Sequence, residues 1–222
     1  MVRVRIPATS ANLGAGFDSL GLAVNLYNYV DMEESDGVFI SSTDGTWVPT
    51  TKENLIYQSA QRLYDECGKK LCGLRIIQQN NIPMTRGLGS SSACIVGGLA
   101  AANQMLGNPL GLDDMVGLAS DIEGHPDNTT PALLGGIVTA VLEEGKVFWV
   151  KQEVHSALRL IAVIPDFKLS TEMARQVLPE KVSHMDARYN LSRAALFSAS
   201  LLQGKYENIR IAVEDRLHQP YR

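Results

Sequence analysis

One stretch constrains this chain more than any other, the run Pro83-Met84-Thr85-Arg86-Gly87-Leu88-Gly89-Ser90-Ser91-Ser92-Ala93. A short apolar run at residues 74–77 precedes it, and small residues with helical character follow it at 93–105. Glycines let the backbone approach an anion closely, and the first N–H groups of a helix lack partners within the helix. The stretch therefore predicts a phosphate-binding turn between a strand and a helix. The common P-loop pattern is absent, and a plain helix cap is the alternative interpretation at this point.

Composition and charge narrow the class of protein. A chain of 222 residues is long enough for one large domain or two small ones. The formal net charge of −4, without a basic block, argues against general nucleic-acid binding. No apolar run reaches the length of a membrane span, and the first residues do not resemble a signal peptide. We therefore expect a cytoplasmic globular protein with no membrane or nucleic-acid partner.

The three cysteines, Cys67, Cys72 and Cys94, are an odd count without the spacing of a metal site. Cys67 and Cys72 are near enough in sequence to pair. Buried free thiols are the favoured interpretation, because disulfides are rare in a reducing cytoplasm.

Apolar periodicity predicts the remaining elements. Alternation predicts a strand at residues 2–6, ended by Pro7, and a second strand at 20–32. Residues 38–41 read as a short strand, followed by a hairpin turn at Asp44-Gly45. Capping-box spacing at 50–53 predicts a helix that ends near Gly68. Further strands are expected at 135–142, 147–150 and 158–164, the last buried on both faces. Further helices are expected at 112–123, from 170 to Pro179, from a Ser183-x-x-Asp186 cap to about residue 202 with Gly204 ending it, and at 206–217.

Two polar clusters accompany the predicted phosphate turn. The first lies in a loop of small residues at 8–18, where an Asx or Gly turn is the simple explanation. Asn12 and Asp18 in this loop can also recognise a hydroxyl and an ammonium group. The second cluster is Glu123-Gly124-His125-Pro126-Asp127-Asn128-Thr129-Thr130-Pro131. A single histidine is more often structural than catalytic, but this density beside a Gly-Pro break predicts a site on a loop held by rigid neighbours.

Together these stretches resemble the GHMP kinase superfamily, and within it the homoserine kinases. The glycine/serine loop of the superfamily is matched by residues 83–93, its opening motif by 7–21, and its central motif by 123–128 followed by 131–136. The pairing of Thr171 with Arg175 and the ending Leu217-His218-Gln219-Pro220-Tyr221-Arg222 are also similar to homoserine kinases. The motifs occur in the family's order, so the resemblance is highly specific.

The resemblance implies an α/β (α+β) fold of two domains. Residues 1–153 would form an ATP-binding domain like the second domain of ribosomal protein S five, and residues 154–222 a partial ferredoxin-like domain. Family members continue with a third glycine-rich motif, so we expect this chain to lack about the last quarter. The implied activity is transfer of the γ-phosphoryl group of ATP to the side-chain hydroxyl of L-homoserine, with Mg²⁺, in threonine biosynthesis. A homodimer is left open.

The resemblance also implies a role for each matched residue. ATP would be bound by Pro83, Arg86, Gly87, Leu88, Gly89, Ser90, Ser91, Ser92 and Ala93, and Mg²⁺ by Ser91 and Glu123, with Asp121 as the alternative carboxylate. The substrate ammonium would pair with Asp18, and its carboxylate with Arg222 and Arg175. Asn12 and Asn128 would orient the attacking hydroxyl, while Thr171, Asp127 and His125 would support the site.

No residue of the central cluster is a convincing general base. A loose transition state needs little prior deprotonation of the alcohol, so catalysis by positioning is the favoured hypothesis. Two rival interpretations stay open. One is a kinase that acts on mevalonate or a sugar, although Asp18 with Arg175 and Arg222 suits a zwitterion better. The other is a nucleotide- or amino-acid-binding protein without turnover.

Overall fold

Strand β2 (Leu20–Glu34) lies at the centre of a six-stranded sheet. Strand β1 (Val2–Ala11) pairs antiparallel with one side of it. On the other side, β4 (Leu74–Gln79) and β5 (Ile137–Glu143) pair antiparallel with opposite ends of β2. The sheet is completed by β3 (Phe39–Ser42), parallel to β4, and by β6 (Lys146–Gln152), antiparallel to β5. The computed structural model describes residues 1–156, 158–164 and 171–222.

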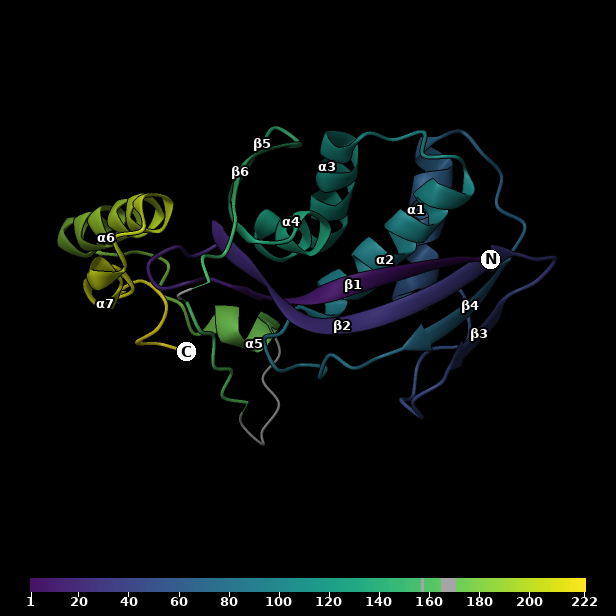
Figure 1. Ribbon diagram of the computed structural model, residues 1–222, viewed down its shortest axis with the longest axis horizontal. Coiled ribbons are helices and arrows are strands. Elements are labelled where there is room, and N and C mark those ends of the chain that lie inside the picture. Colours follow the sequence, from purple (N-terminus) through teal and green to yellow (C-terminus); the bar gives the residue numbers. More distant parts are fainter. Residues whose placement is uncertain (157, 165–170) are drawn as a thin grey trace.

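Four helices cover one face of this sheet (Figure 1). They are α1 (Leu55–Glu66), α2 (Ser90–Met105), α3 (Leu112–Glu123) and α4 (Pro126–Leu134). Helices α2 and α4 pack directly on β1 and β2, while α1 packs on α2 and α3 on α4. The main core lies between these layers and includes Ile6, Met32, Leu63, Ile76 and Leu99. The mixed α/β fold predicted from the sequence is thereby confirmed.

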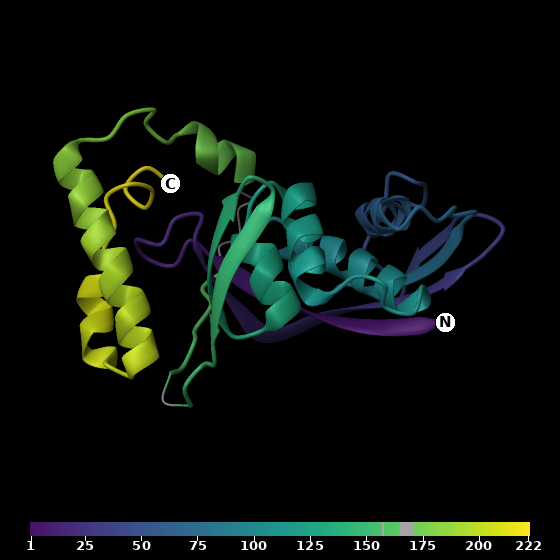
Figure 2. The ribbon, with the colours of Figure 1, turned by 90° about the horizontal axis from the view of Figure 1, so that it is seen from above.

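The remaining helices lie at the end of the molecule opposite the N-terminus (Figures 1 and 2). They are α5 (Thr171–Gln176), α6 (His184–Gln203), a 3₁₀ turn (Tyr206–Asn208) and α7 (Ile209–Ala212). A second, small core joins Leu20 to Phe197 and Ala212, with Leu13 and Val213 packed against it. The loop between β1 and β2 therefore docks on α6 and α7.

Helix α6 has the predicted ends. The Ser183 hydroxyl accepts a hydrogen bond from the Asp186 N–H at 3.0 Å, and Gly204 ends the helix in the left-handed conformation. Helix α3 has the predicted bounds. The cysteines are free as expected, but they are not fully buried, because Cys67 and Cys94 are half-buried and Cys72 is exposed. None of the helices in the described part of the chain is long and apolar enough to cross a membrane.

Three predictions for the N-terminal half are wrong in detail. Strand β1 continues through Pro7 to Ala11, because its register with β2 shifts between Pro7 and Ala8, and such an irregularity accommodates the missing N–H. Asp44-Gly45 is not a hairpin turn, since β3 and β4 run parallel and α1 connects them. Helix α1 is capped by Asn54, whose Oδ1 accepts from the Ile56 N–H at 3.0 Å, and not by residues 50–53.

The central polar cluster was wrongly predicted to be a loop. Gly124 ends α3, and α4 begins two residues later at Pro126. Proline is favoured at the first position of a helix, so Pro126 begins α4 two residues after Gly124 has ended α3. The cluster is therefore held on a helix N-terminus and not on a flexible connection.

The predicted strand at 158–164 is also absent. These residues form no strand, and the side chains of Ile161 and Val163 are each 89% exposed. A strand needs a hydrogen-bonded neighbour, and nothing in residues 1–156 or 171–222 pairs with this run. The predicted helix at 206–217 is shortened, because Asp215 accepts hydrogen bonds from the N–H groups of Leu217 and His218 and so holds a turn. The predicted helix start at Ser170 lies outside the described residues.

Candidate active site

The glycine/serine stretch forms a turn that leads into α2. Gly89 is the N-cap of α2 with φ of +67°, and a Cβ there would lie 1.9 Å from the Thr9 hydroxyl oxygen. Gly87 also has φ of +67°, and a Cβ at that position would meet nothing within 4 Å. One glycine is thus required by packing, and the other leaves open space at the helix N-terminus. This local structure suits the phosphates of a nucleotide.

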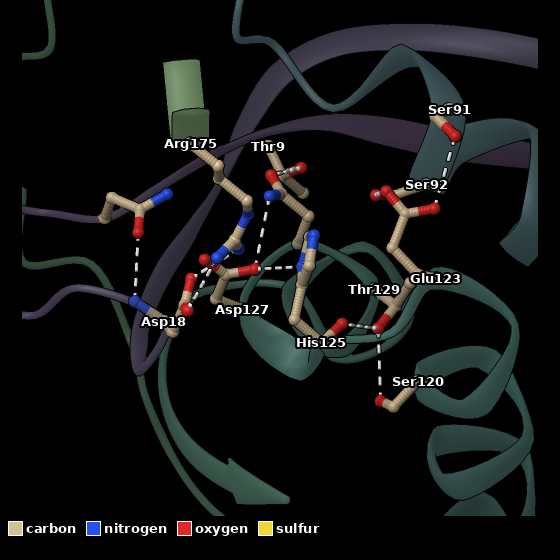
Figure 3. A network of polar contacts seen from close by, with 12 residues as sticks. Thr9, Asp18, Ser91, Ser92, Ser120, Glu123, His125, Asp127, Thr129 and Arg175 are labelled. Atoms are coloured by element: carbon tan, nitrogen blue, oxygen red, sulfur yellow. Dashed lines mark hydrogen bonds and ion pairs between the residues drawn. The ribbon is translucent and has the colours of Figure 1, made fainter. Parts of the chain in front are cut away.

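Two serines of α2 meet the last residue of α3. The Ser91 hydroxyl donates to Glu123 Oε2 at 3.2 Å, and the Ser92 hydroxyl donates to Oε1 at 2.9 Å (Figure 3). Asp121, the alternative carboxylate, has a side chain 69% exposed and lies 3.6 Å from Arg62. Glu123 is therefore the carboxylate that faces the turn.

The donors around Glu123 fit Mg²⁺. No group of three His, Cys, Asp or Glu side chains suited to a metal occurs in the described ranges. Mg²⁺ is commonly held by one or two carboxylates and completes its shell with waters and substrate phosphates. A single carboxylate with hydroxyls of Ser91 and Ser92 beside it matches that chemistry.

The central cluster is built around a buried carboxylate. Asp127 Oδ1 lies 2.7 Å from His125 Nδ1 and accepts a hydrogen bond from Asn128 Nδ2 at 3.3 Å. Asp127 Oδ2 is buried without a hydrogen-bond partner among the described residues. The hydrogen bond to Asp127 raises the pKa of His125, although burial works in the opposite direction. His125 and Asp127 therefore act as one unit.

The position of Asp127 depends on close packing of α4 against β2. A Cβ at Gly21 would lie 1.7 Å from the Asp127 carbonyl oxygen, so only glycine permits this approach. Within α4, Pro131 has no N–H to donate to the same carbonyl. The Ser120 and Thr129 hydroxyls, 3.2 Å apart, further join α3 to α4.

Thr9 connects the central cluster to the glycine/serine turn. Its hydroxyl donates to Asn128 Oδ1 at 2.8 Å, and its N–H donates to the Leu88 carbonyl at 3.1 Å. Thr9 was not predicted to be a site residue, although it lies within the opening motif. Its place in the loop of small residues at 8–18, three positions before Asn12, was the available signal.

The opposite end of the site is an ion pair. Both guanidinium NH groups of Arg175 donate to the Asp18 carboxylate, at 3.0 and 2.7 Å. Asn12 Oδ1 accepts from the Asp18 N–H at 2.9 Å, and both residues have positive φ. The Asp18 carboxylate raises the pKa of Arg175. The two side chains that were expected to bind opposite ends of a zwitterion thus bind each other, close to Asp127 (Figure 3).

Phe17 contacts both arginines that were predicted to bind the substrate carboxylate. The Arg175 and Arg222 Cζ atoms lie 5.4 and 5.7 Å from the centre of its ring, which suits cation–π contacts. The His218 ring lies 5.1 Å from the same ring, and His218 Nε2 is 2.8 Å from the Gly14 carbonyl oxygen. Phe17 was not predicted to be a site residue, although it lies within the opening motif. Thr171 begins α5, but its side chain lies outside the part of the chain that the structure describes.

Most of the predicted residues therefore belong to one region (Figure 3). Ser91, Ser92 and Glu123 form one end, Asp18 and Arg175 the other, and the unit of His125 and Asp127 lies between them. A cavity of about 950 Å³ lies elsewhere, along α3 and β6, and contains none of these residues. The convergence of polar groups, and not the size of a hollow, identifies the site.

Comparisons with known proteins identify the family of this chain. Residues 54–136 match the GHMP kinases N terminal domain. The homoserine kinase of Caldicellulosiruptor bescii is 49% identical over 224 aligned residues, which cover all of this chain and 73% of that protein. The crystal structure of homoserine kinase from Cytophaga hutchinsonii aligns with a TM-score of 0.84 at 29% identity. The alignment covers all of this chain and 73% of that one.

A putative homoserine kinase from Listeria monocytogenes has a TM-score of 0.79 at 32% identity, with 96% of this chain and 72% of that structure aligned. The similarity extends along the entire chain and includes every element that carries a residue of the site. The chain therefore belongs to the homoserine kinase family of the GHMP kinases.

Proposed function

We propose that this chain transfers the γ-phosphoryl group of ATP to the side-chain hydroxyl of L-homoserine, giving O-phospho-L-homoserine. Family membership supports an ATP-dependent kinase. The observation that carries the proposal is the placement of an Asp18–Arg175 ion pair beside Asp127, in the same region as the glycine/serine turn. A zwitterion with a hydroxyl side chain needs such a pair of opposite charges next to a phosphate-binding turn.

The acceptor would exchange partners with the ion pair. Its ammonium group replaces Arg175 on the Asp18 carboxylate, and its carboxylate binds the released Arg175 together with Arg222. Both arginines contact the Phe17 ring, and this contact would limit the conformational entropy that they lose on binding. Asn12 has its amide oxygen engaged by the Asp18 N–H, so its amide N–H groups remain for the acceptor. Thr171 would support the acceptor site, as the family resemblance implies.

The donor side would hold ATP at the start of α2. The backbone of residues 86–92, with Ser90 and the helix N-terminus, binds the phosphates, while Pro83 and Ala93 border the turn. Glu123, with Ser91 and Ser92, would hold Mg²⁺, which neutralises charge on the phosphates when it is bound.

We propose catalysis by positioning rather than by a general base. Asp127 Oδ1 is already engaged by His125 and Asn128, and Oδ2, which has no partner among the described residues, is covered from solvent. A carboxylate so placed fixes its neighbours and is poorly placed to collect a proton from a bound alcohol. Since phosphoryl transfer passes through a loose transition state, orientation by Asn128 and charge stabilisation supply most of the catalysis.

The domain division at residue 153 remains a proposal, supported by the fact that the sheet ends at Gln152. A cytoplasmic location and a homodimer are likewise proposals. Sedimentation analysis of the purified chain would check the homodimer.

The test is an ADP-release assay with ATP and Mg²⁺ that compares L-homoserine with L-serine, L-threonine and mevalonate. We expect turnover with L-homoserine alone. Turnover with mevalonate would refute the proposed substrate. Tight ATP binding without ADP release on any acceptor would instead support a binding protein without turnover.

A further inference from the structure

We infer that Thr9 is a positioning residue, which holds the Asn128 amide in place and joins it to the nucleotide-binding turn. The inference rests on the proposed function, in which Asn128 orients the acceptor hydroxyl. Thr9 is fully buried near the end of β1, 119 positions from Asn128. Its hydroxyl donates to Asn128 Oδ1 at 2.8 Å, the usual distance for a hydrogen bond from a hydroxyl.

The contacts of Asn128 allow one orientation of its amide. An asparagine amide has an acceptor end and a donor end. The acceptor end, Oδ1, receives the Thr9 hydroxyl, and the donor end, Nδ2, donates to Asp127 Oδ1 at 3.3 Å. A 180° flip would place Oδ1 against the Asp127 carboxylate, which can only accept, so Asp127 selects which end of the amide faces it. The Thr9 hydroxyl, which can donate or accept, then donates to Oδ1 and holds the amide in that position.

Thr9 has a second set of contacts with the nucleotide-binding turn. Its N–H donates to the Leu88 carbonyl at 3.1 Å. Its hydroxyl oxygen occupies the space that a Cβ at Gly89 would need, which is why only glycine fits beside it. Thr9 thus touches the N-cap of α2 and Asn128 at the same time. Its hydroxyl therefore holds the Asn128 amide at a fixed place relative to the turn that is proposed to bind the phosphates.

Two substitutions separate this role from simple packing. Thr9→Val keeps the shape of the side chain and removes the hydroxyl, while Thr9→Ser keeps the hydroxyl and removes the methyl group. We expect Thr9→Val to lower kcat about 10- to 100-fold, as misplacement of a reacting group does, with the KM for ATP changed less than about threefold. Thr9→Ser should retain kcat within about threefold of the unmodified chain. Equal damage by both substitutions would overturn the inference.

A double-mutant cycle tests the partner. In an Asn128→Ala background the hydroxyl of Thr9 has no amide to hold, so Thr9→Val should lower kcat by less than about twofold. Independent, multiplicative losses would show that Thr9 acts through the fold and not through Asn128. Thermal unfolding of each variant gives the fraction that is folded in the assay.

A spectroscopic measurement keeps this test separate from the proposed function. In ¹⁵N-labelled protein, the side-chain amide signals of Asn128 are identified by their loss in Asn128→Ala. We expect Thr9→Val to shift these signals and to speed their hydrogen exchange, and Thr9→Ser to leave them nearly in place. Unchanged signals in Thr9→Val would refute the inference. If the unmodified chain fails to phosphorylate L-homoserine, the proposed function fails, and the spectra still decide whether Thr9 holds Asn128 in place.

Discussion

Replacing Asp18 with asparagine tests the proposed acceptor site most directly, provided that two acceptors are compared. L-homoserine carries the ammonium group that Asp18 is proposed to bind, and 4-hydroxybutyrate has the same hydroxyl and carboxylate without it. We expect Asp18→Asn to lower kcat/KM for L-homoserine and to leave the much lower kcat/KM for 4-hydroxybutyrate within about threefold. The comparison removes effects of the substitution that do not involve the ammonium group.

The size of the effect follows from the exposure of the contact. A hydrogen bond to a charged group contributes about 1.5–3 kcal/mol. The Asp18 side chain is 37% exposed, and solvent screening weakens the contact, so we expect its contribution to lie at the lower end, about 1.5–2 kcal/mol. Since about 1.36 kcal/mol corresponds to a factor of ten, kcat/KM for L-homoserine should fall about 10- to 30-fold. The assay is ADP release at saturating ATP with each acceptor varied.

Glu33→Gln is a matched control. Glu33 Oε1 lies 3.3 Å from Arg75 Nε and Oε2 lies 3.8 Å from the N-terminal ammonium group. The Glu33 side chain has the same 37% exposure as Asp18 and lies at the end of β2 opposite the loop that carries Asp18. The partly exposed ion pairs that the two substitutions remove are worth at most about 1 kcal/mol each, so Tm should fall by no more than about 4 °C for each pair lost. Only Asp18→Asn should affect turnover. An equal fall of kcat/KM for both acceptors would refute the reasoning, because Asp18 would then only shape its loop.

Three further predictions concern the carboxylates of the network. Glu123→Gln should raise the Mg²⁺ concentration needed for half-maximal ADP release about 10- to 100-fold, while Asp121→Asn, on the same helix, should leave it unchanged; equal effects would contradict the assignment. In the folded state the pKa of His125 is raised above its ordinary value near 6.5. Protonated His125 therefore stabilises the fold below about pH 6.5, and this stabilisation is lost as the pH rises through the pKa of the folded state. The free energy of unfolding in urea should accordingly differ between the unmodified chain and His125→Gln more at pH 6 than at pH 9, and a difference independent of pH would be evidence against the charged pair. Asp127→Asn should lower kcat less than about 100-fold with the same pH–rate profile, since a general base contributes about 10²–10⁴; a larger loss in a folded variant would identify Asp127 as a base.

The sequence determined the parts of the protein that depend on local chemistry. Alternating apolar residues identified most of the sheet, and the Ser183 cap and Gly204 defined the ends of α6. The two glycines of the turn and the serines after them indicated an anion site before any fold was known. The motifs in their order also placed the chain in its family. These features depend on neighbouring residues, which a linear reading contains.

The tertiary structure decided what residues far apart do to one another. Residues 158–164 read as a buried strand, yet no described strand pairs with them and they are exposed, because burial is a property of neighbours. Thr9 became a candidate only when β1 brought its hydroxyl to Asn128. Asp18 and Arg175 were each predicted to bind the substrate, and only the fold shows that they neutralise each other across 157 positions. Long-range contacts of this kind are set by how the layers pack, which no local pattern in the sequence specifies.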